Sequence, residues 1–397
     1  MPADYDLLVI GGGITGLSTA VHAARRGLRT VLVEAAPELG GVSTQRSGAL
    51  VRTHYEDAAS ARLALRGLEL FESFTERYGG PSGFTSTGFA YVPTADEVTS
   101  GALADRTRTL QSVGVETRLV DADELRGIDP SIDVSDVGVV AYEPRSGFAD
   151  PAQTCATLAH AATEAGAELR PSTAALRLLV DGSGTVTGAE VRSAATDAAE
   201  MLEAEQVVLC SGAWSVALAA AAGVDLPIRP TAVKLGFVRR SGPMHLIVID
   251  AVNGIYLRPD PAGRTLVGRR TWTDEPLSGP DADLPEVDDA FLTDTSERLA
   301  RRLPRFRGQP VVDTRAGMLD MTPDALPLVG PALDRSGDAV PGLWLNCGWS
   351  GTGFKTGTAV GEALVDLIAT GRSPLDLSSY TTSRPFPQSA EPVRSPH

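Results

Sequence analysis

The sequence predicts an α/β protein in which a doubly wound domain is joined to a second lobe of α+β type, built on an antiparallel sheet. Three observations favour this fold. A glycine-rich turn joins an apolar strand to a helical segment within the first 26 residues. Two more buried strands occur late in the chain, at 206–210 and 342–346, and each leads into a glycine-containing turn. Short strands and turns fill the intervening stretches. The chain of 397 residues also exceeds the ~250–300 residues at which a single core stops growing, so two lobes are expected.

The first 34 residues are expected to form a βαβ unit. Residues 5–10 are a short, β-rich apolar run, residues 14–26 are rich in alanine with helical character, and residues 30–34 are a second buried strand. The N-terminal stretch has no basic region before its apolar run and no cleavage site after it. It is therefore interpreted as the first strand and not as a signal peptide.

A GxGxxG motif, made by Gly11, Gly13 and Gly16, lies between that strand and that helix. The first glycine allows a tight turn, the second lets the backbone approach a pyrophosphate, and the third lets helix and strand pack closely. Glu34 ends the second strand, where a carboxylate can accept hydrogen bonds from ribose hydroxyls and disfavours NADP. The motif predicts a Rossmann-like dinucleotide site.

The chain is expected to leave this domain and to return to it twice. An amphipathic helix at 57–78 stops at two glycines, and short strands with an acidic helix at 121–126 follow. Asp150 as N-cap and Pro151 in the first turn then start a helix that belongs to the first domain again. The predicted boundaries are 1–80, 145–230 and 310–372 for the first domain, 81–144 and 231–309 for a substrate domain, and 383–397 for a disordered tail rich in Pro and Ser.

The later segments carry further elements. Strands joined by a turn at 181–184 are expected before the strand at 206–210. The β pattern at 233–270 and an amphipathic helix at 288–302 suit the second lobe. The last strand, at 342–346, leads through a glycine-rich turn into a helix at 356–370.

Two late turns favour FAD over NAD, which share the ADP half that the first motif recognises. Residues 207–213 run from a strand into Ser-Gly-Ala, and residues 348–355 form a glycine-rich turn between a strand and a helix. Three separate segments of the chain form the first domain, as expected when an extended flavin is held from both ends. The predicted cofactor-binding residues are Gly11, Gly13, Ile14, Thr15, Gly16, Glu34, Ala35, Gly41, Val42, Ser43, Ser211, Gly212, Gly348, Gly351, Thr352, Gly353, Phe354 and Lys355.

The composition argues against several function classes. A formal net charge of −15 would repel phosphate backbones, so nucleic acid is not expected as a partner. No apolar run reaches the ~18–20 residues that cross a bilayer, so no membrane span is expected. Cys155, Cys210 and Cys347 are too few and too scattered for a disulfide framework or a zinc site, which predicts no metal and a reducing cytoplasm.

Five segments, in this order, resemble the glycine oxidase, D-amino acid oxidase and sarcosine oxidase family of flavoproteins, and most closely its sarcosine oxidase branch. They are VIGGGITGLSTA with Glu34, LVRTHYEDA (50–58), NGIYLRP (253–259), MTPDALPLVGP (321–331) and GWSGTGFKTG (348–357), and the resemblance spans about residues 4–372. It implies an FAD enzyme that oxidises the C–N bond next to the carboxylate of an amino acid, one secondary or N-substituted, by hydride transfer to the flavin. The product would be an imine, which water hydrolyses.

The resemblance also implies how a substrate is held. Arg52 falls where sarcosine oxidases carry a carboxylate-binding arginine, and Lys355 falls on the lysine of the family's GFK element. Arginine offers carboxylate a planar fork and lysine adds a point charge. The alternative is that each makes a salt bridge at the surface or between lobes.

Five further residues on matched segments are candidates for the catalytic site. Tyr55 and Tyr256 would line the pocket or belong to the core, and His54 would act as a proton shuttle or pack in its loop. Arg258 and Arg270 are cations expected to face the cleft.

The sequence departs from the family at positions that matter for electron transfer. No cysteine occurs at 315–320, before MTPD, where monomeric sarcosine oxidases attach FAD, so noncovalent FAD is predicted. Leu266 or Val267 replaces a lysine that promotes the reaction with oxygen, although Lys234, Arg269 or Arg270 could supply the charge. Oxidase and dehydrogenase activity both stay open, as do oxidation of a 2-hydroxy acid and a role as the FAD-binding subunit of a heteromeric dehydrogenase with a partner subunit.

Overall fold

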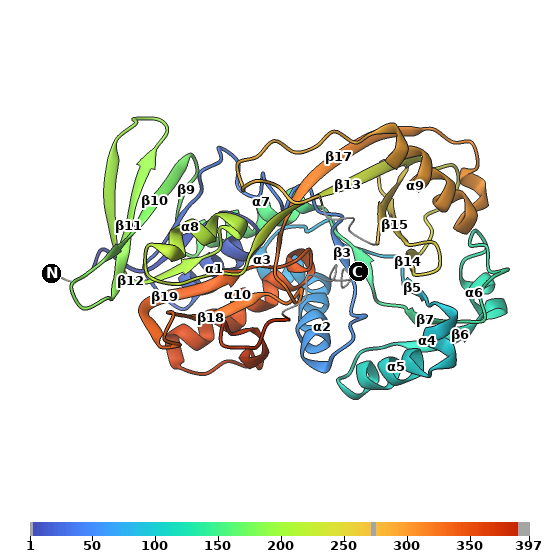
Figure 1. The fold of residues 1–397 in the computed structure, drawn as a ribbon, viewed down its shortest axis with the longest axis horizontal. Coiled ribbons are helices and arrows are strands. Elements are labelled where there is room, and N and C mark those ends of the chain that lie inside the picture. Colours follow the sequence, from blue (N-terminus) through green and yellow to red (C-terminus); the bar gives the residue numbers. More distant parts are fainter. Residues whose placement is uncertain (1–2, 271–274, 388–397) are drawn as a thin grey trace.

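The structure is a computed structural model that describes residues 3–270 and 275–387. Its first layer is a mixed eight-stranded sheet (Figure 1). The expected βαβ unit is present: β1 (Tyr5–Ile10), α1 (Ile14–Arg25) and β2 (Thr30–Val33), with β1 and β2 paired in parallel. The parallel strands β12 (Ala199–Leu209), β19 (Ala339–Cys347) and β9 (Glu168–Arg170) extend the sheet, and β10 (Thr173–Val180), β11 (Val186–Ser193) and β18 (Leu328–Leu333) are antiparallel.

Both faces of this sheet are buried, and successive side chains of its central strands pack on opposite faces. Leu7, Val9 and Leu32 pack against helices α1, α7 (Pro151–Glu164) and α10 (Gly353–Thr370). Leu8 and Val31 point to the other face, where they join residues of α8 (Ser215–Ala220) and of the β10–β12 ribbon. Successive strand residues point to opposite faces, so these continuous apolar runs require cover on both sides.

Helix α7 begins as the sequence predicts, because the Asp150 side chain accepts from the Gln153 N–H and Pro151 occupies the first turn. The long helix expected at 57–78 is instead two helices, α2 (Ala58–Glu72) and α3 (Phe74–Tyr78). The break is at Ser73, whose hydroxyl donates to the Glu69 carbonyl and whose backbone lies outside the helical region.

The second layer is an eight-stranded sheet, antiparallel except at the β14–β5 pair. Its strands in spatial order are β17 (Val311–Met321), β13 (Arg229–Arg239), β16 (Arg264–Arg269), β15 (Ile255–Asp260), β14 (Ile247–Asp250), β5 (Phe89–Val92), β7 (Val139–Glu143) and β6 (Arg118–Asp121). The helical elements of this lobe are α4 (Ala95–Thr99), α5 (Ala102–Ser112), α6 (Ala122–Ile128), α9 (Asp289–Arg302) and η2 (Pro304–Phe306).

Strand β17 lies in the second sheet, although its residues fall within 310–372, which the sequence analysis assigned to the first domain. It pairs with β13 from Arg229↔Met321 to Val238↔Val311. Figure 1 shows this long ribbon running from the first layer into the second. A strand paired along its whole length follows its partner, so β17 could not stay in the first sheet.

Short elements complete the chain. β3 (Leu50–Val51), β8 (Gly147–Phe148) and β4 (Thr85–Ser86) form a three-stranded sheet, η1 (Gly212–Trp214) precedes α8, and η3 (Ser378–Tyr380) follows α10. In residues 383–387, which belong to the tail expected to be disordered, the Arg384 guanidinium bonds both carboxylate oxygens of Asp324 at 2.6 and 3.0 Å. The rest of that tail, 388–397, lies outside the described residues.

Candidate active site

The turn between β1 and α1 has no room for side chains at two of its glycines. A Cβ on Gly11, whose φ is +110°, would lie 2.6 Å from the Cys210 carbonyl oxygen. A Cβ on Gly16 would lie 1.9 Å from the Gly11 carbonyl oxygen. The turn therefore packs directly on the end of β12, and the backbone at the start of α1 faces a cavity.

Glu34 holds the other side of this turn. Its carboxylate accepts the Gly12 N–H at 2.6 Å and the Ala36 N–H at 2.8 Å. These bonds fix the carboxylate at the wall of the cavity, where it can also accept from a ribose.

The cavity has a volume of about 640 Å³ and runs from this turn to Tyr256 and Lys355. Most of the predicted cofactor-binding residues line it: Gly11, Gly13, Ile14, Thr15, Glu34, Ala35, Gly41, Val42, Ser43, Ser211, Gly212, Gly351, Gly353, Phe354 and Lys355. A long cavity that begins at a glycine cradle and is walled mainly by apolar atoms fits an extended dinucleotide.

Three predicted cofactor residues, Gly16, Gly348 and Thr352, are not in its lining. Gly16 lies beneath the turn, and Thr352 lines a second cavity. Gly348, with φ +69°, donates its N–H to Asp320 Oδ2 at 2.7 Å.

Sequence reasoning missed Asp320, which lines the cofactor cavity from the end of β17. Burial raises the pKa of this carboxyl to about 6, although backbone N–H groups of the 348–350 turn oppose the shift. It also missed Thr44, Arg46, Ser47 and Gly48, which line the same cavity and belong to no motif in the sequence.

A second cavity, of about 450 Å³, lies against the first, and Trp349 lines both. The predicted residues Arg52, His54, Tyr55 and Arg270 line it. Its walls also carry Tyr91, Arg106 and Tyr380, none of which the sequence analysis selected.

Arg52 and Lys355 come together where the two cavities meet. Arg52 is 1% exposed and Lys355 is 2% exposed. Both face the ring of Tyr55, with Arg52 Cζ 5.0 Å and Lys355 Nζ 5.8 Å from its centroid. Two buried cations this close favour an anion, since an opposite charge would offset both their burial and their repulsion.

The electrostatics of the pair agree with this arrangement. Burial lowers the pKa of Arg52, and burial followed by the charge of Arg52 lowers the pKa of Lys355 well below its usual range. Arg52 is oriented by its own loop, because one guanidinium N–H donates to the His54 carbonyl. The site thus presents two buried basic groups, one of them held in place by its own loop.

Tyr256 and Arg258 lie on β15 but do not share an environment. Tyr256 lines the cofactor cavity and burial raises the pKa of its hydroxyl. Arg258 lines neither cavity: its guanidinium donates to the carbonyls of Gly48 and Pro259 and lies 4.8 Å from the centroid of Phe148. The two residues are two positions apart on one strand, so their side chains point to the same face of the sheet. The alternation of side chains therefore could not predict which of the two faces a cavity.

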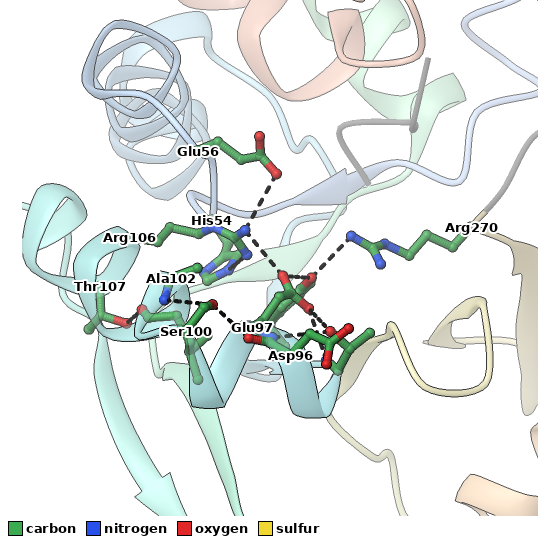
Figure 2. A network of polar contacts seen from close by, with 12 residues as sticks. His54, Glu56, Asp96, Glu97, Ser100, Ala102, Arg106, Thr107 and Arg270 are labelled. Atoms are coloured by element: carbon green, nitrogen blue, oxygen red, sulfur yellow. Dashed lines mark hydrogen bonds and ion pairs between the residues drawn. The ribbon is translucent and has the colours of Figure 1, made fainter. Parts of the chain in front are cut away.

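A polar network runs along one wall of the second cavity (Figure 2). Arg270 donates to the Tyr91 hydroxyl at 3.0 Å, and that hydroxyl donates to Glu97 at 2.7 Å. Arg106 also bonds Glu97, at 3.2 Å. Tyr91 and Arg106 come from the second lobe, which shows that both lobes build this cavity.

Arg106 connects this network to the loop of the first domain. It lies 3.4 Å from Glu56 and 3.4 Å from His54 Nε2. The His54 ring stacks on Tyr91 with centroids 4.6 Å apart. Burial, and then the charges of Arg106, Arg52 and Arg270, lower the pKa of His54 well below its usual value.

The other cations considered for the oxygen reaction are in ion pairs. Lys234 contacts Glu275 at 2.8 Å and Asp288 at 3.0 Å, and Arg269 contacts Asp294 at 2.9 Å. All three cysteines are buried free thiols. Within residues 3–270 and 275–387 no cluster of three or more His, Cys, Asp or Glu is placed to hold a metal, and no helix is long and apolar enough to cross a membrane.

Comparisons with known proteins agree on one family. Residues 6–367 match the family described as DAO, FAD dependent oxidoreductase. Sarcosine dehydrogenase, mitochondrial, of Homo sapiens is 27% identical over 402 residues, which are 97% of this chain but only 42% of that relative, so the chain spans less than half of its length. Sarcosine oxidase subunit beta of Rhodobacter capsulatus is 25% identical over 380 residues, 94% of this chain and 86% of the subunit.

Among solved structures, L-proline dehydrogenase from P. horikoshii superposes with a TM-score of 0.85 at 26% identity, covering 96% of this chain and 97% of that one. The fold class predicted from the sequence is confirmed.

Proposed function

Because this chain belongs to the FAD dependent oxidoreductase family, we propose that it oxidises the C–N bond of an amino acid, one that is secondary or substituted on nitrogen. One observation carries the proposal. Arg52 and Lys355 are both buried against the Tyr55 ring, at the junction of a dinucleotide-shaped cavity and a second cavity. An α-carboxylate bound there would place the adjacent carbon at the boundary between the two.

The first cavity would hold FAD. Its pyrophosphate would lie against the N-terminus of α1 at Gly11 and Gly13, and its ribose against Glu34, while Gly351 and Gly353 allow close approach at the other end. Bound FAD supplies the acceptor for the hydride equivalent that leaves the substrate carbon. In the absence of a cysteine at 315–320, noncovalent attachment is part of the proposal.

The protein's own contribution is to bind and orient the substrate. Arg52 would hold the carboxylate by its fork and Lys355 by a point charge, so that the α C–H is directed at the cofactor cavity. Tyr55, Trp349 and Tyr380 supply buried aromatic walls to the second cavity, which would exclude water around the reacting bond.

An anaerobic absorbance titration tests this function. The purified holoprotein is titrated with N-methyl, cyclic, D- and L-amino acids and with 2-hydroxy acids, and air is then admitted. Bleaching of the flavin band by one class of amino acid supports the proposal, and bleaching by 2-hydroxy acids alone contradicts it. Fast reoxidation in air would identify an oxidase, and slow reoxidation a dehydrogenase.

A partner subunit is the second part of the proposal. The similarity to a sarcosine oxidase subunit beta supports it. Copurification from the native source followed by a turnover assay tests it: a partner that raises turnover of the chain supports the assembly, and full turnover by the chain alone contradicts it. The three cysteines are too few and too scattered for a disulfide framework, which supports a reducing compartment such as the cytoplasm; fractionation would check this location.

A further inference from the structure

Glu143, the last residue of β7, is 1% exposed and bonds Thr53, which lies between two residues that line the second cavity, Arg52 and His54. Its Oε2 accepts the Thr53 N–H at 3.0 Å and the Ser146 hydroxyl at 2.6 Å. Its Oε1 has no hydrogen-bond partner among the described residues and lies 3.7 Å from His54 Nδ1, which has none there either. A buried carboxylate oxygen and a buried ring nitrogen that face each other require an explanation, since unpaired buried polar atoms are costly.

The other ring nitrogen of His54 determines what this pair can do. Arg106 faces Nε2 at 3.4 Å, and a guanidinium can only donate. Nε2 must therefore be the acceptor, so the proton of the neutral ring lies on Nδ1 and points at Glu143 Oε1. The lowered pKa of His54, caused first by burial, agrees with a neutral ring.

Glu143 thus contacts the loop that carries Arg52 in two ways, by one hydrogen bond and by an electrostatic approach at 3.7 Å. The first involves the Thr53 N–H and the second the His54 ring, while the His54 carbonyl receives the guanidinium of Arg52. Phe89, the strand partner of Glu143, lies 5.8 Å from Arg52 Cζ. Two residues of the second lobe, Glu143 and Phe89, therefore lie against Arg52 and its loop.

We propose that Glu143, acting through Thr53 and His54, is a positioning residue for Arg52 and so for the substrate carboxylate. The inference rests on the proposed function of Arg52 as the carboxylate-binding residue. The negative charge of Glu143 favours the charged form of Arg52 but opposes the binding of a substrate anion, so we assign its contribution to binding to the geometry that it imposes.

Glu143→Gln tests this, because the amide keeps an acceptor for Thr53 but presents an NH₂ group to His54 Nδ1. The ring would then face a donor on each side, which no neutral imidazole can satisfy. We expect the dissociation constant of the holoprotein for cyclopentanecarboxylate, measured by calorimetry, to rise about tenfold. Loss of the negative charge of Glu143 would by itself tighten the binding of this anion. A variant that binds cyclopentanecarboxylate as tightly as the parent protein, or more tightly, therefore overturns the proposal.

The double variant Glu143→Gln/Arg106→Met provides the rescue. Without the donor at Nε2 the ring can carry its proton there and accept at Nδ1 from the newly introduced amide, so binding is expected to recover most of the loss. Nitrogen NMR of the histidines reports the tautomer directly: Nδ1–H in the parent protein and Nε2–H in the double variant. His22, which is half-buried, and His245, which is buried, lie outside both cavities and are internal references. An Nε2–H tautomer in the parent protein would contradict the proposal.

Two controls separate positioning from stability and from the proposed function. Asp129→Asn removes another buried carboxylate that accepts backbone N–H groups, those of Ser131 and Leu246, away from both cavities. If it weakens cyclopentanecarboxylate as much as Glu143→Gln does, the effect is general destabilisation and the inference fails. If Arg52→Met leaves that binding intact, the proposed role of Arg52 fails, whereas the His54 tautomer still reports on Glu143.

Discussion

Lys355 is a buried amine whose charged form the fold disfavours. Burial and Arg52 lower its pKa well below the usual 10.5, so over the range between the lowered and the usual value the unfolded chain binds a proton that the folded chain lacks. Stability from this residue therefore rises with pH across that range. Buried charges of this kind are retained for function and not for stability.

Lys355→Met is expected to separate these two properties. The ligand-free protein should become more stable by about 1 kcal/mol near neutral pH and lose the rise with pH, while the affinity for carboxylates falls at least about tenfold. Chemical denaturation at several pH values and calorimetry with cyclopentanecarboxylate measure the two effects. A variant that is less stable and still binds the carboxylate would contradict this account of Lys355.

Glu34 supports the cofactor at the residue scale. Glu34→Ala removes the acceptor that binds the Gly12 and Ala36 N–H groups and that is proposed to bind the ribose. The dissociation constant for FAD should rise about tenfold or more, measured by flavin fluorescence during reconstitution of the apoprotein. Glu38→Ala is the matched control, since Glu38 is exposed and lies outside the cavity lining; an equal loss there would mean that charge and not contact matters.

At the scale of elements, the contact between α2 and α10 places Lys355. A Cβ on Gly67 of α2 would lie 2.0 Å from the Lys355 carbonyl oxygen, so the two helices touch through backbone. The first turn of α10 also lines the cofactor cavity. A change in the packing of α2 against α10 would therefore shift the residues of α10 that line the cofactor cavity.

Gly67→Ala should therefore act against ordinary helix propensity. Alanine in a helix normally stabilises by about 0.5–1 kcal/mol relative to glycine, but here we expect a loss of about 1–3 kcal/mol and weaker FAD retention. Gly127→Ala in α6, where a Cβ would meet nothing within 4 Å, is the control and should be neutral or stabilising. Thermal denaturation of both variants decides the matter, and a stabilised Gly67→Ala protein would refute the close contact.

At the scale of the whole molecule, FAD is expected to be a removable part of the structure. Acid precipitation should release all flavin to the supernatant, because the stretch at 315–320 has no cysteine and the three thiols are buried. Reconstitution at 100 times the dissociation constant should stabilise the folded state by about 2.7 kcal/mol, seen as a rise in Tm with FAD concentration. Flavin that stays with the precipitate would show a covalent link instead.

Local patterns in the sequence determined the elements that short-range physics controls. The βαβ unit, the glycine turn, the place of Glu34 and the start of α7 at Asp150 follow from backbone sterics, apolar periodicity and capping within a few residues. The order of five motifs then indicated the family, which the match over residues 6–367 confirms.

Only the tertiary structure decided which distant residues meet. It brought Arg52 and Lys355 to the same tyrosine ring, placed Arg258 outside both cavities, and placed β17 in the second sheet. It also added Arg106 and Glu143 from the second lobe, which no motif marks. The reason is physical: a motif reports interactions between neighbours in the chain, whereas a site between two lobes depends on how their sheets and helices pack against each other.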